Sequence, residues 1–251
     1  MKIAVLGDSH TVALRLGLAE LQADPAVDLA VEIHARRVLP SPDLIKPFFA
    51  ELNGEVSFLD PAASEATRKV IGSPGFGPDH GDWIFAFSLG FMTTFLLNLD
   101  DWLEFAPWCS ARRDRQLISD GVLRAIARRH NRYVLDFYRA IRGLGLRCVA
   151  IQAPPPMEGD RWFNHGADEP TILHLDAVFR EAIEDELRAL GVPTVPIPVA
   201  AFDDRGFRRS EFWSHKVKRD DRVHANAAFG RLMIPEIVKS AMANFQPDSA
   251  P

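Results

Sequence analysis

Two short groups of reactive residues stand near opposite ends of this 251-residue chain. Residues 7–10 read Gly-Asp-Ser-His, and residues 221–224 read Asp-Arg-Val-His. A serine hydroxyl becomes a strong nucleophile when a histidine takes its proton, and an aspartate orients and stabilises that histidine. Ser9, His224 and Asp221 are therefore candidates for a hydrolytic triad.

The first group lies between a predicted strand and a predicted helix. Residues 2–6 form an apolar run, and residues 11–21 carry several leucines and a valine in a pattern that we assign to a helix. The free amide groups at the start of a helix favour a developing oxyanion, so this turn suits a nucleophile. We expect Asp8 to hold the turn and His10 to lie near the pocket. The competing interpretation is that Ser9 and His224 only cap or pack at the starts of their helices.

The rest of the chain alternates between predicted strands and helices. Strands are expected at residues 27–33, 83–89, 146–151 and 192–197, with an ambiguous short one at 56–59, and helices at 114–144 (one or two), 171–190 and 226–244. This alternation predicts an α/β fold, in which a parallel sheet is covered by helices on both faces. Ligands of such sheets bind beyond the carboxyl ends of the strands, where Ser9 is expected.

We expect one domain over residues 1–251. Residues 91–110 are rich in aromatic side chains and form an insertion, either a helical one packed on the core or an apolar wall beside a pocket. Residues 246–251 are expected to be a disordered tail.

Composition excludes several classes of protein. A net charge of −5 and a pI of about 5.9 argue against a nucleic-acid binder. No apolar run reaches the length of a membrane span, and no secretory signal is visible, so we expect a cytoplasmic protein. Two cysteines are too few for a disulfide framework or a thiolate zinc site, and the predicted chemistry requires no metal or organic cofactor.

Together, the motif at residues 7–9, the Asp-x-x-His at 221–224 and the trailing Asn226 and Gly230 resemble the SGNH or GDSL hydrolase family. The resemblance implies a flavodoxin-like, three-layer α/β/α fold. It makes Ser9 the nucleophile and one oxyanion donor, His224 the base and Asp221 the supporting acid. Gly90 fits the glycine of the family's central Gly-x-Asn.

The central motifs depart from the family pattern in two places. Residues 34–40, after the second predicted strand, contain no glycine, and Met92 stands where the family has asparagine. Methionine cannot donate the hydrogen bond that the asparagine supplies. Thr93, Thr94, Asn98 or a backbone amide near Arg36 are the candidates to replace these donors.

The expected function is hydrolysis of an ester, with acyl or acetyl groups on a carbohydrate favoured over lipids. Five tryptophans are candidate sugar platforms, namely Trp83, Trp102, Trp108, Trp162 and Trp213. An acyltransferase and a non-catalytic glycan-binding or assembly module remain alternatives, and the sequence does not specify the oligomeric state. A third alternative is a metal-dependent phosphoesterase in which Asp8 and His10 bind metal.

Overall fold

The computed structural model describes residues 1–91, 104–110, 114–158, 167–214 and 224–245. In these residues the main sheet has five parallel strands, in the order β10-β9-β6-β1-β2. The strands are β1 (Lys2–Gly7), β2 (Glu32–Arg37), β6 (Trp83–Ser88), β9 (Arg147–Ile151) and β10 (Thr194–Val195). The second strand along the chain therefore lies outside the first, and the remaining strands follow on the other side, which is the flavodoxin-like order.

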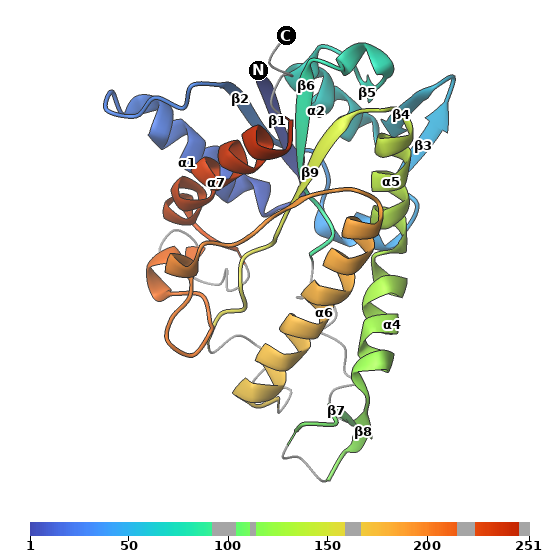
Figure 1. The fold of residues 1–251 in the computed structure, drawn as a ribbon, viewed down its shortest axis with the longest axis vertical. Helices are drawn as coiled ribbons and strands as arrows, with labels where there is room; N and C mark the ends of the chain where they lie inside the picture. Colours follow the sequence, from blue (N-terminus) through green and yellow to red (C-terminus); the bar gives the residue numbers. More distant parts are fainter. Residues whose placement is uncertain (92–103, 111–113, 159–166, 215–223, 246–251) are drawn as a thin grey trace.

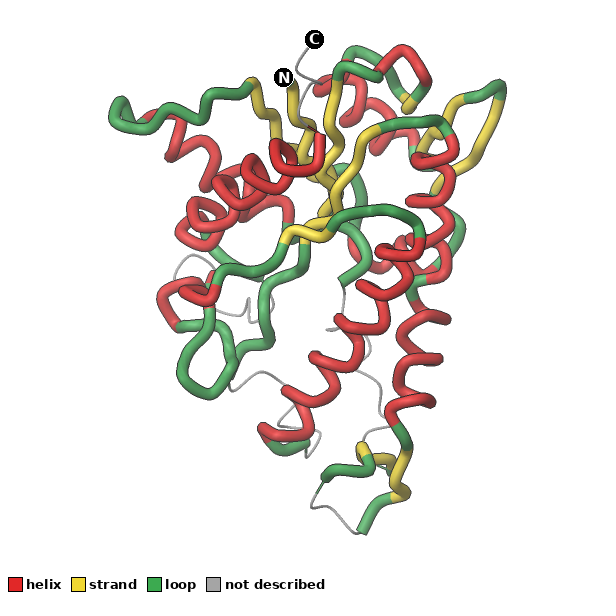
Figure 2. The backbone as a smooth tube through the Cα atoms, viewed as in Figure 1, coloured by secondary structure: helices red, strands yellow, loops and turns green. Residues whose placement is uncertain are grey.

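Helices cover both faces of this sheet (Figures 1 and 2). They are α1 (Thr11–Ala23), α2 (Pro61–Ile71), α4 (Asp120–His130), α5 (Arg132–Gly143), α6 (Glu169–Ala189) and α7 (Ala227–Phe245). Alternate residues of β1 enter two separate cores: Ile3 and Val5 pack with α1 and α7, whereas Ala4 and Leu6 pack with α2, α5 and α6. The expected three-layer α/β/α fold is confirmed.

Helices α1 and α7 cross with almost no space between their backbones. A Cβ atom on Gly230 would lie 2.0 Å from the carbonyl oxygen of Ala13, and one on Gly17 would lie 2.2 Å from the backbone nitrogen of Arg231. Only glycine allows this approach. The crossing places the start of α7 beside the start of α1, so segments from opposite ends of the sequence lie close together.

The second strand was predicted in the wrong place. Residues 27–33 are more apolar, but the strand is β2 at Glu32–Arg37. The Asp24 and Asp28 side chains accept hydrogen bonds from the amides of Ala26 and Ala30, which makes turns of the segment before it. Because β2 is at the sheet edge, its polar side chains reach solvent, and an apolar pattern is not required.

A second, antiparallel sheet lies beside the first, and of its three strands only the ambiguous one at residues 56–59 was expected. It contains β3 (Phe49–Leu52), β4 (Glu55–Phe58) and β5 (Gly75–Phe76). Phe58 and Phe76 meet edge to face, and both contact Phe137 of α5. This aromatic cluster fastens the small sheet to the main core.

The aromatic insertion lies partly outside the described residues: of residues 91–110, the structure describes residue 91 and residues 104–110. Its described part is not helical: β7 (Phe105–Pro107) pairs with β8 (Gln116–Ile118). The predicted tail at 246–251 also lies outside the described residues. Residues 114–144, where one or two helices were expected, contain two, α4 and α5.

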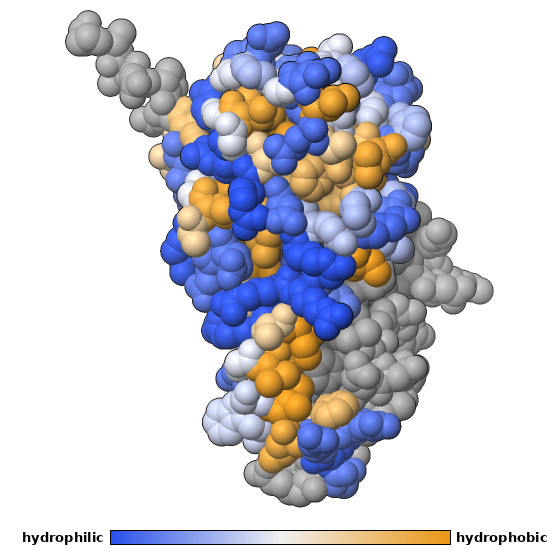
Figure 3. Space-filling model, turned by 90° about the vertical axis from the view of Figure 1, so that its right-hand side faces the viewer, coloured by the Kyte–Doolittle hydropathy of each residue, from blue (hydrophilic) through white to orange (hydrophobic). Residues whose placement is uncertain are grey.

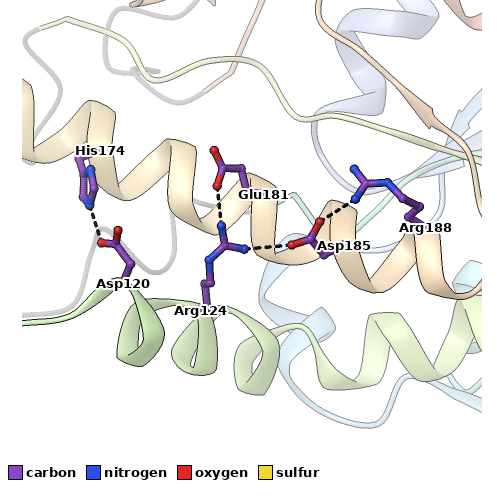
Figure 4. A network of polar contacts seen from close by, with 6 residues as sticks. All are labelled: Asp120, Arg124, His174, Glu181, Asp185 and Arg188. Carbon is purple, nitrogen blue, oxygen red and sulfur yellow. Dashed lines mark hydrogen bonds and ion pairs between the residues drawn. The ribbon is translucent and has the colours of Figure 1, made fainter.

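Helices α4 and α6 run side by side and extend beyond the sheet (Figure 1). Two ion pairs and a hydrogen bond link them, as Figure 4 shows: Arg124 pairs with Glu181 at 2.6 Å and with Asp185 at 3.1 Å, and His174 is hydrogen-bonded to Asp120 at 2.8 Å. Exposed pairs of this kind contribute little singly, and more as a network. Leu117 and Val122, close to the start of α4, are exposed apolar side chains. Figure 3 shows an apolar stripe on the lower part of the face that it draws.

Candidate active site

Ser9 lies in the turn between β1 and α1, at the carboxyl edge of the sheet. Asp8 holds this turn, because its Oδ1 accepts a hydrogen bond from the His10 amide at 2.9 Å. His10 occupies the capping position of α1, and the first turn of the helix uses the carbonyl groups of residues 8–10. The hydroxyl of Ser9 therefore does not cap the helix, and that interpretation is wrong for this residue.

The Ser9 hydroxyl instead contacts a residue that the sequence did not indicate. Ser9 Oγ lies 2.9 Å from Ser41 Oγ, and Ser41 Oγ donates to Asp8 Oδ2 at 2.9 Å. An ionised carboxylate only accepts hydrogen bonds, so the single proton of Ser41 goes to Asp8. Ser41 then accepts from Ser9. The result is a directed chain from Ser9 through Ser41 to the buried Asp8.

We expect Ser41→Ala to lower the free energy of unfolding by about 1–3 kcal/mol, because a buried carboxylate oxygen loses its donor. Urea unfolding followed by circular dichroism measures this loss. Ser41→Thr keeps a hydroxyl and should recover most of it. An alanine variant as stable as the parent would show that Asp8 does not depend on this bond.

His224 reaches the same edge from the other end of the chain. Ala225 forms a β-bridge with Trp213, and the amide of Ser214 donates to the His224 carbonyl at 3.2 Å. The start of α7 is capped by Asn226, whose Oδ1 accepts from the Phe229 amide at 3.3 Å. The cap that sequence reasoning allowed for His224 is therefore supplied by its neighbour.

Ser9 and His224 line one cavity of about 550 Å³. Volumes of this order are typical of small-molecule sites. Its other described lining residues come from α1, the end of β2, Ser214, the two residues before α7 and the start of α7: Val12, Leu16, Glu20, Arg37, Ser214, Ala225, Asn226, Ala227 and Ala228. The structure thus brings the candidate nucleophile and base, which are far apart in sequence, to a common space.

His10 is buried next to His224, one of the residues that line this cavity. Its ring centroid lies 5.3 Å from that of His224, with the two planes tilted by 51°. Burial lowers the pKa of His10 from 6.5 to about 4; Asp8 opposes the shift, and the positive charges of His224, Arg208 and Arg180 add to it. His10 is consequently neutral at neutral pH.

This shift makes stability depend on pH. Between pH 6.5 and about 4 the unfolded chain binds a proton at His10 that the folded chain does not, so the free energy of unfolding falls as the pH falls. We expect a slope from this group of up to about 1.4 kcal/mol per pH unit. It should disappear in His10→Asn and persist in the control His34→Asn, which alters an exposed histidine. Urea titrations between pH 4 and 8 measure it, and identical slopes in all three proteins would contradict it.

Gly90 follows β6, the strand beside β1. Its φ of +101° is one that side chains rarely adopt, and a Cβ atom there would lie 2.8 Å from Val134 Cγ1. Tyr138 fixes the backbone before it by donating to the carbonyl groups of Phe87 and Leu89, at 3.2 and 3.3 Å. Gly90 therefore lies at the expected sheet edge, although it is not among the lining residues of the cavity.

Several predicted participants lie outside the described residues. These are Asp221, Met92 and the substitutes proposed for its missing donor, namely Thr93, Thr94 and Asn98. The tryptophans Trp102 and Trp162 also lie outside, and none of the three described tryptophans lines the cavity.

The metal-dependent alternative assigns ligand roles to Asp8 and His10. Both oxygens of Asp8 accept hydrogen bonds, and the ring of His10 packs against His224. Among the residues that the structure describes, no group of three or more His, Cys, Asp or Glu side chains could hold a metal ion. The same residues include no helix long and apolar enough to cross a membrane.

No protein-family model matches the sequence, and no curated protein matches it. Solved structures match over most of the chain. A candidate SGNH hydrolase from Slackia heliotrinireducens is 16% identical, with 96% of this chain and 98% of that chain covered and a TM-score of 0.48. A GDSL-like lipase from Bacteroides thetaiotaomicron is 7% identical over 97% and 89%, with a TM-score of 0.49. The lipase/acylhydrolase from Enterococcus faecalis is 13% identical over 99% and 99%, with a TM-score of 0.42.

The chain is similar in structure to SGNH and GDSL hydrolases. Two residues of the candidate site were missed by sequence reasoning, Ser41 and Arg37. The true position of β2 explains both. The strand ends at Arg37, which places Arg37 at the sheet edge, and the segment that follows leads to Ser41. With the strand expected four residues earlier, neither residue was at the sheet edge.

Proposed function

We propose that this protein is an SGNH-type serine esterase, in which Ser9 attacks the acyl carbonyl of an ester and His224 takes the serine proton. The observation that supports this most is that both residues line one cavity at the carboxyl edge of a flavodoxin-like sheet. Asp221 is the supporting acid in this proposal, three residues before the base.

The reaction runs in two steps. The Ser9 hydroxyl exchanges its bond to Ser41 for one to His224, and the alkoxide oxygen forms an acyl-enzyme as the alcohol leaves with the proton from His224. Water, activated by the same histidine, then releases the acid. The Ser9 amide at the start of α1 and the amide of Gly90 are the proposed oxyanion donors.

The neutral His10 assists the base. A positive charge 5.3 Å from the imidazole would disfavour the imidazolium that forms when His224 accepts a proton. Burial keeps the pKa of His10 at about 4 and removes that charge at neutral pH. His10 can thus pack against the ring of His224 without placing a positive charge beside it.

The size of the cavity and its apolar wall of Val12, Leu16 and Ala228 suit a small acyl ester. The test is to treat the purified protein with a fluorophosphonate probe and with 4-nitrophenyl esters of two to six carbons. Covalent labelling and turnover are expected. A folded protein that neither reacts with the probe nor hydrolyses any ester would overturn the proposal in favour of a binding module.

A further inference from the structure

Arg37 brings a positive charge to the cavity beside the candidate nucleophile. It is the last residue of β2 and pairs in register with Gly7, two residues before Ser9. Its side chain is exposed and lines the same cavity as Ser9 and His224. Neighbouring parallel strands lie about 5 Å apart, so the arginine stem starts close to the reacting serine.

The charge of Arg37 is not compensated within the described part of the chain. Its Nε donates weakly to the carbonyl of Leu39 at 3.4 Å, and no ion pair joins it to any described acidic residue. The acidic residue on the cavity wall, Glu20, is paired elsewhere: its Oε2 lies 3.8 Å from the guanidinium of Arg231 on α7. Among the described residues of the cavity wall, Glu20 is therefore paired with a cation, whereas Arg37 is not paired with an anion.

We propose that Arg37 selects esters that carry an anionic group, a carboxylate or a phosphate, at a second position of the substrate. This inference rests on the proposed esterase function and adds the class of substrate. A guanidinium offers two parallel donors to such a group, which gives orientation as well as attraction. A neutral ester of the same shape would occupy the apolar wall but leave Arg37 with water alone.

The experiment compares two pairs of esters, in each of which one member carries a free carboxylate and the other the methyl ester of that carboxylate. The monoester of adipate with 4-nitrophenol and its methyl ester place the charge on the acyl side, whereas 4-acetoxybenzoate and its methyl ester place it on the alcohol side. Initial rates, corrected for spontaneous hydrolysis, are measured for the parent, Arg37→Ala, Arg37→Lys and Arg37→Glu. The matched control is Arg36→Ala, because the preceding side chain on a strand points to the opposite face.

The parent should prefer the acidic member of at least one pair, which also tells which side of the ester carries the charge. Arg37→Ala should lower kcat/KM for that acidic ester by about tenfold, mainly through KM, and change the neutral ester less than about twofold. Arg37→Lys should be intermediate, and Arg37→Glu should prefer the neutral ester. The preference should weaken as salt is raised from 20 to 500 mM.

Two results would overturn this inference while the esterase function stands. One is a parent that hydrolyses both members of each pair equally well, and the other is an Arg37→Ala effect that is the same for acidic and neutral esters or is matched by Arg36→Ala. A parent that neither reacts with the fluorophosphonate probe nor hydrolyses any of the four esters would overturn the proposed function, and the inference with it.

Discussion

Replacement of Ser9 by alanine is expected to lower kcat for a short-chain 4-nitrophenyl ester by about 10⁴-fold or more. In the proposed mechanism the variant loses the oxygen that forms the acyl-enzyme, whereas the cavity and the turn around it stay in place. His224→Ala should cost a similar factor, because the serine then has no base. The double variant should be little worse than either single one, since the two residues act as a unit.

The controls separate chemistry from folding. Ser240→Ala changes a serine toward the far end of α7 and should leave turnover unchanged. Fluorophosphonate labelling should vanish in Ser9→Ala while the urea midpoint stays within error of the parent. Full activity in Ser9→Ala would remove this serine from the mechanism.

Gly230→Ala is expected to have the largest effect on stability. The added Cβ would lie 2.0 Å from the carbonyl oxygen and 2.7 Å from the carbonyl carbon of Ala13. Both are backbone atoms, so no side-chain rotation can relieve the contact, and α1 and α7 must separate. We expect the free energy of unfolding to fall by about 3 kcal/mol, at the upper end of the cost of overpacking.

The matched control is Gly143→Ala, at the end of α5, where a Cβ atom would meet nothing within 4 Å. That change should be neutral or stabilise by about 0.5 kcal/mol, because alanine restricts the unfolded chain. Urea unfolding of both variants measures the difference. A Gly230→Ala variant within about 0.5 kcal/mol of the parent would contradict the close crossing of α1 and α7.

The separation of α1 and α7 also has a functional consequence. Val12 and Leu16 of α1 line the cavity together with Ala227 and Ala228 of α7, and Ser9 and His224 lie just before the starts of the two helices. Glycine at position 230 therefore holds the two halves of the candidate site together. The close crossing of α1 and α7 is thus the physical reason for a glycine at this position, shortly after His224.

The buried strands and the edge strand β10 were predicted from the sequence, whereas the edge strand β2 was misplaced. The strands β1 and β6 lie in the middle of the sheet and are buried on both faces, so each is a continuous apolar run. The edge strand β2 is polar, and the other edge strand, β10, is only two residues long. A run of apolar residues indicates a buried strand, and β2, whose polar side chains reach solvent, has no such run.

The sequence by itself determined the alternation of strands and helices and the parallel sheet. It also indicated the candidates Ser9 and His224, near the two ends of the chain. These follow from local patterns, because apolar runs and turn residues are read over a few neighbouring positions. Whether Asp221 completes the triad stays a prediction, since it lies outside the described residues.

Only the tertiary structure decided that Ser41 accepts from Ser9, that His10 packs on His224, and that Arg37 lines their cavity. Each of these contacts joins segments that are distant in sequence and depends on where β2 ends and how α7 crosses α1. A shift of a few residues in one polar edge strand decides whether Arg37 reaches the cavity and Ser41 reaches Ser9, and no local pattern in the sequence records that shift.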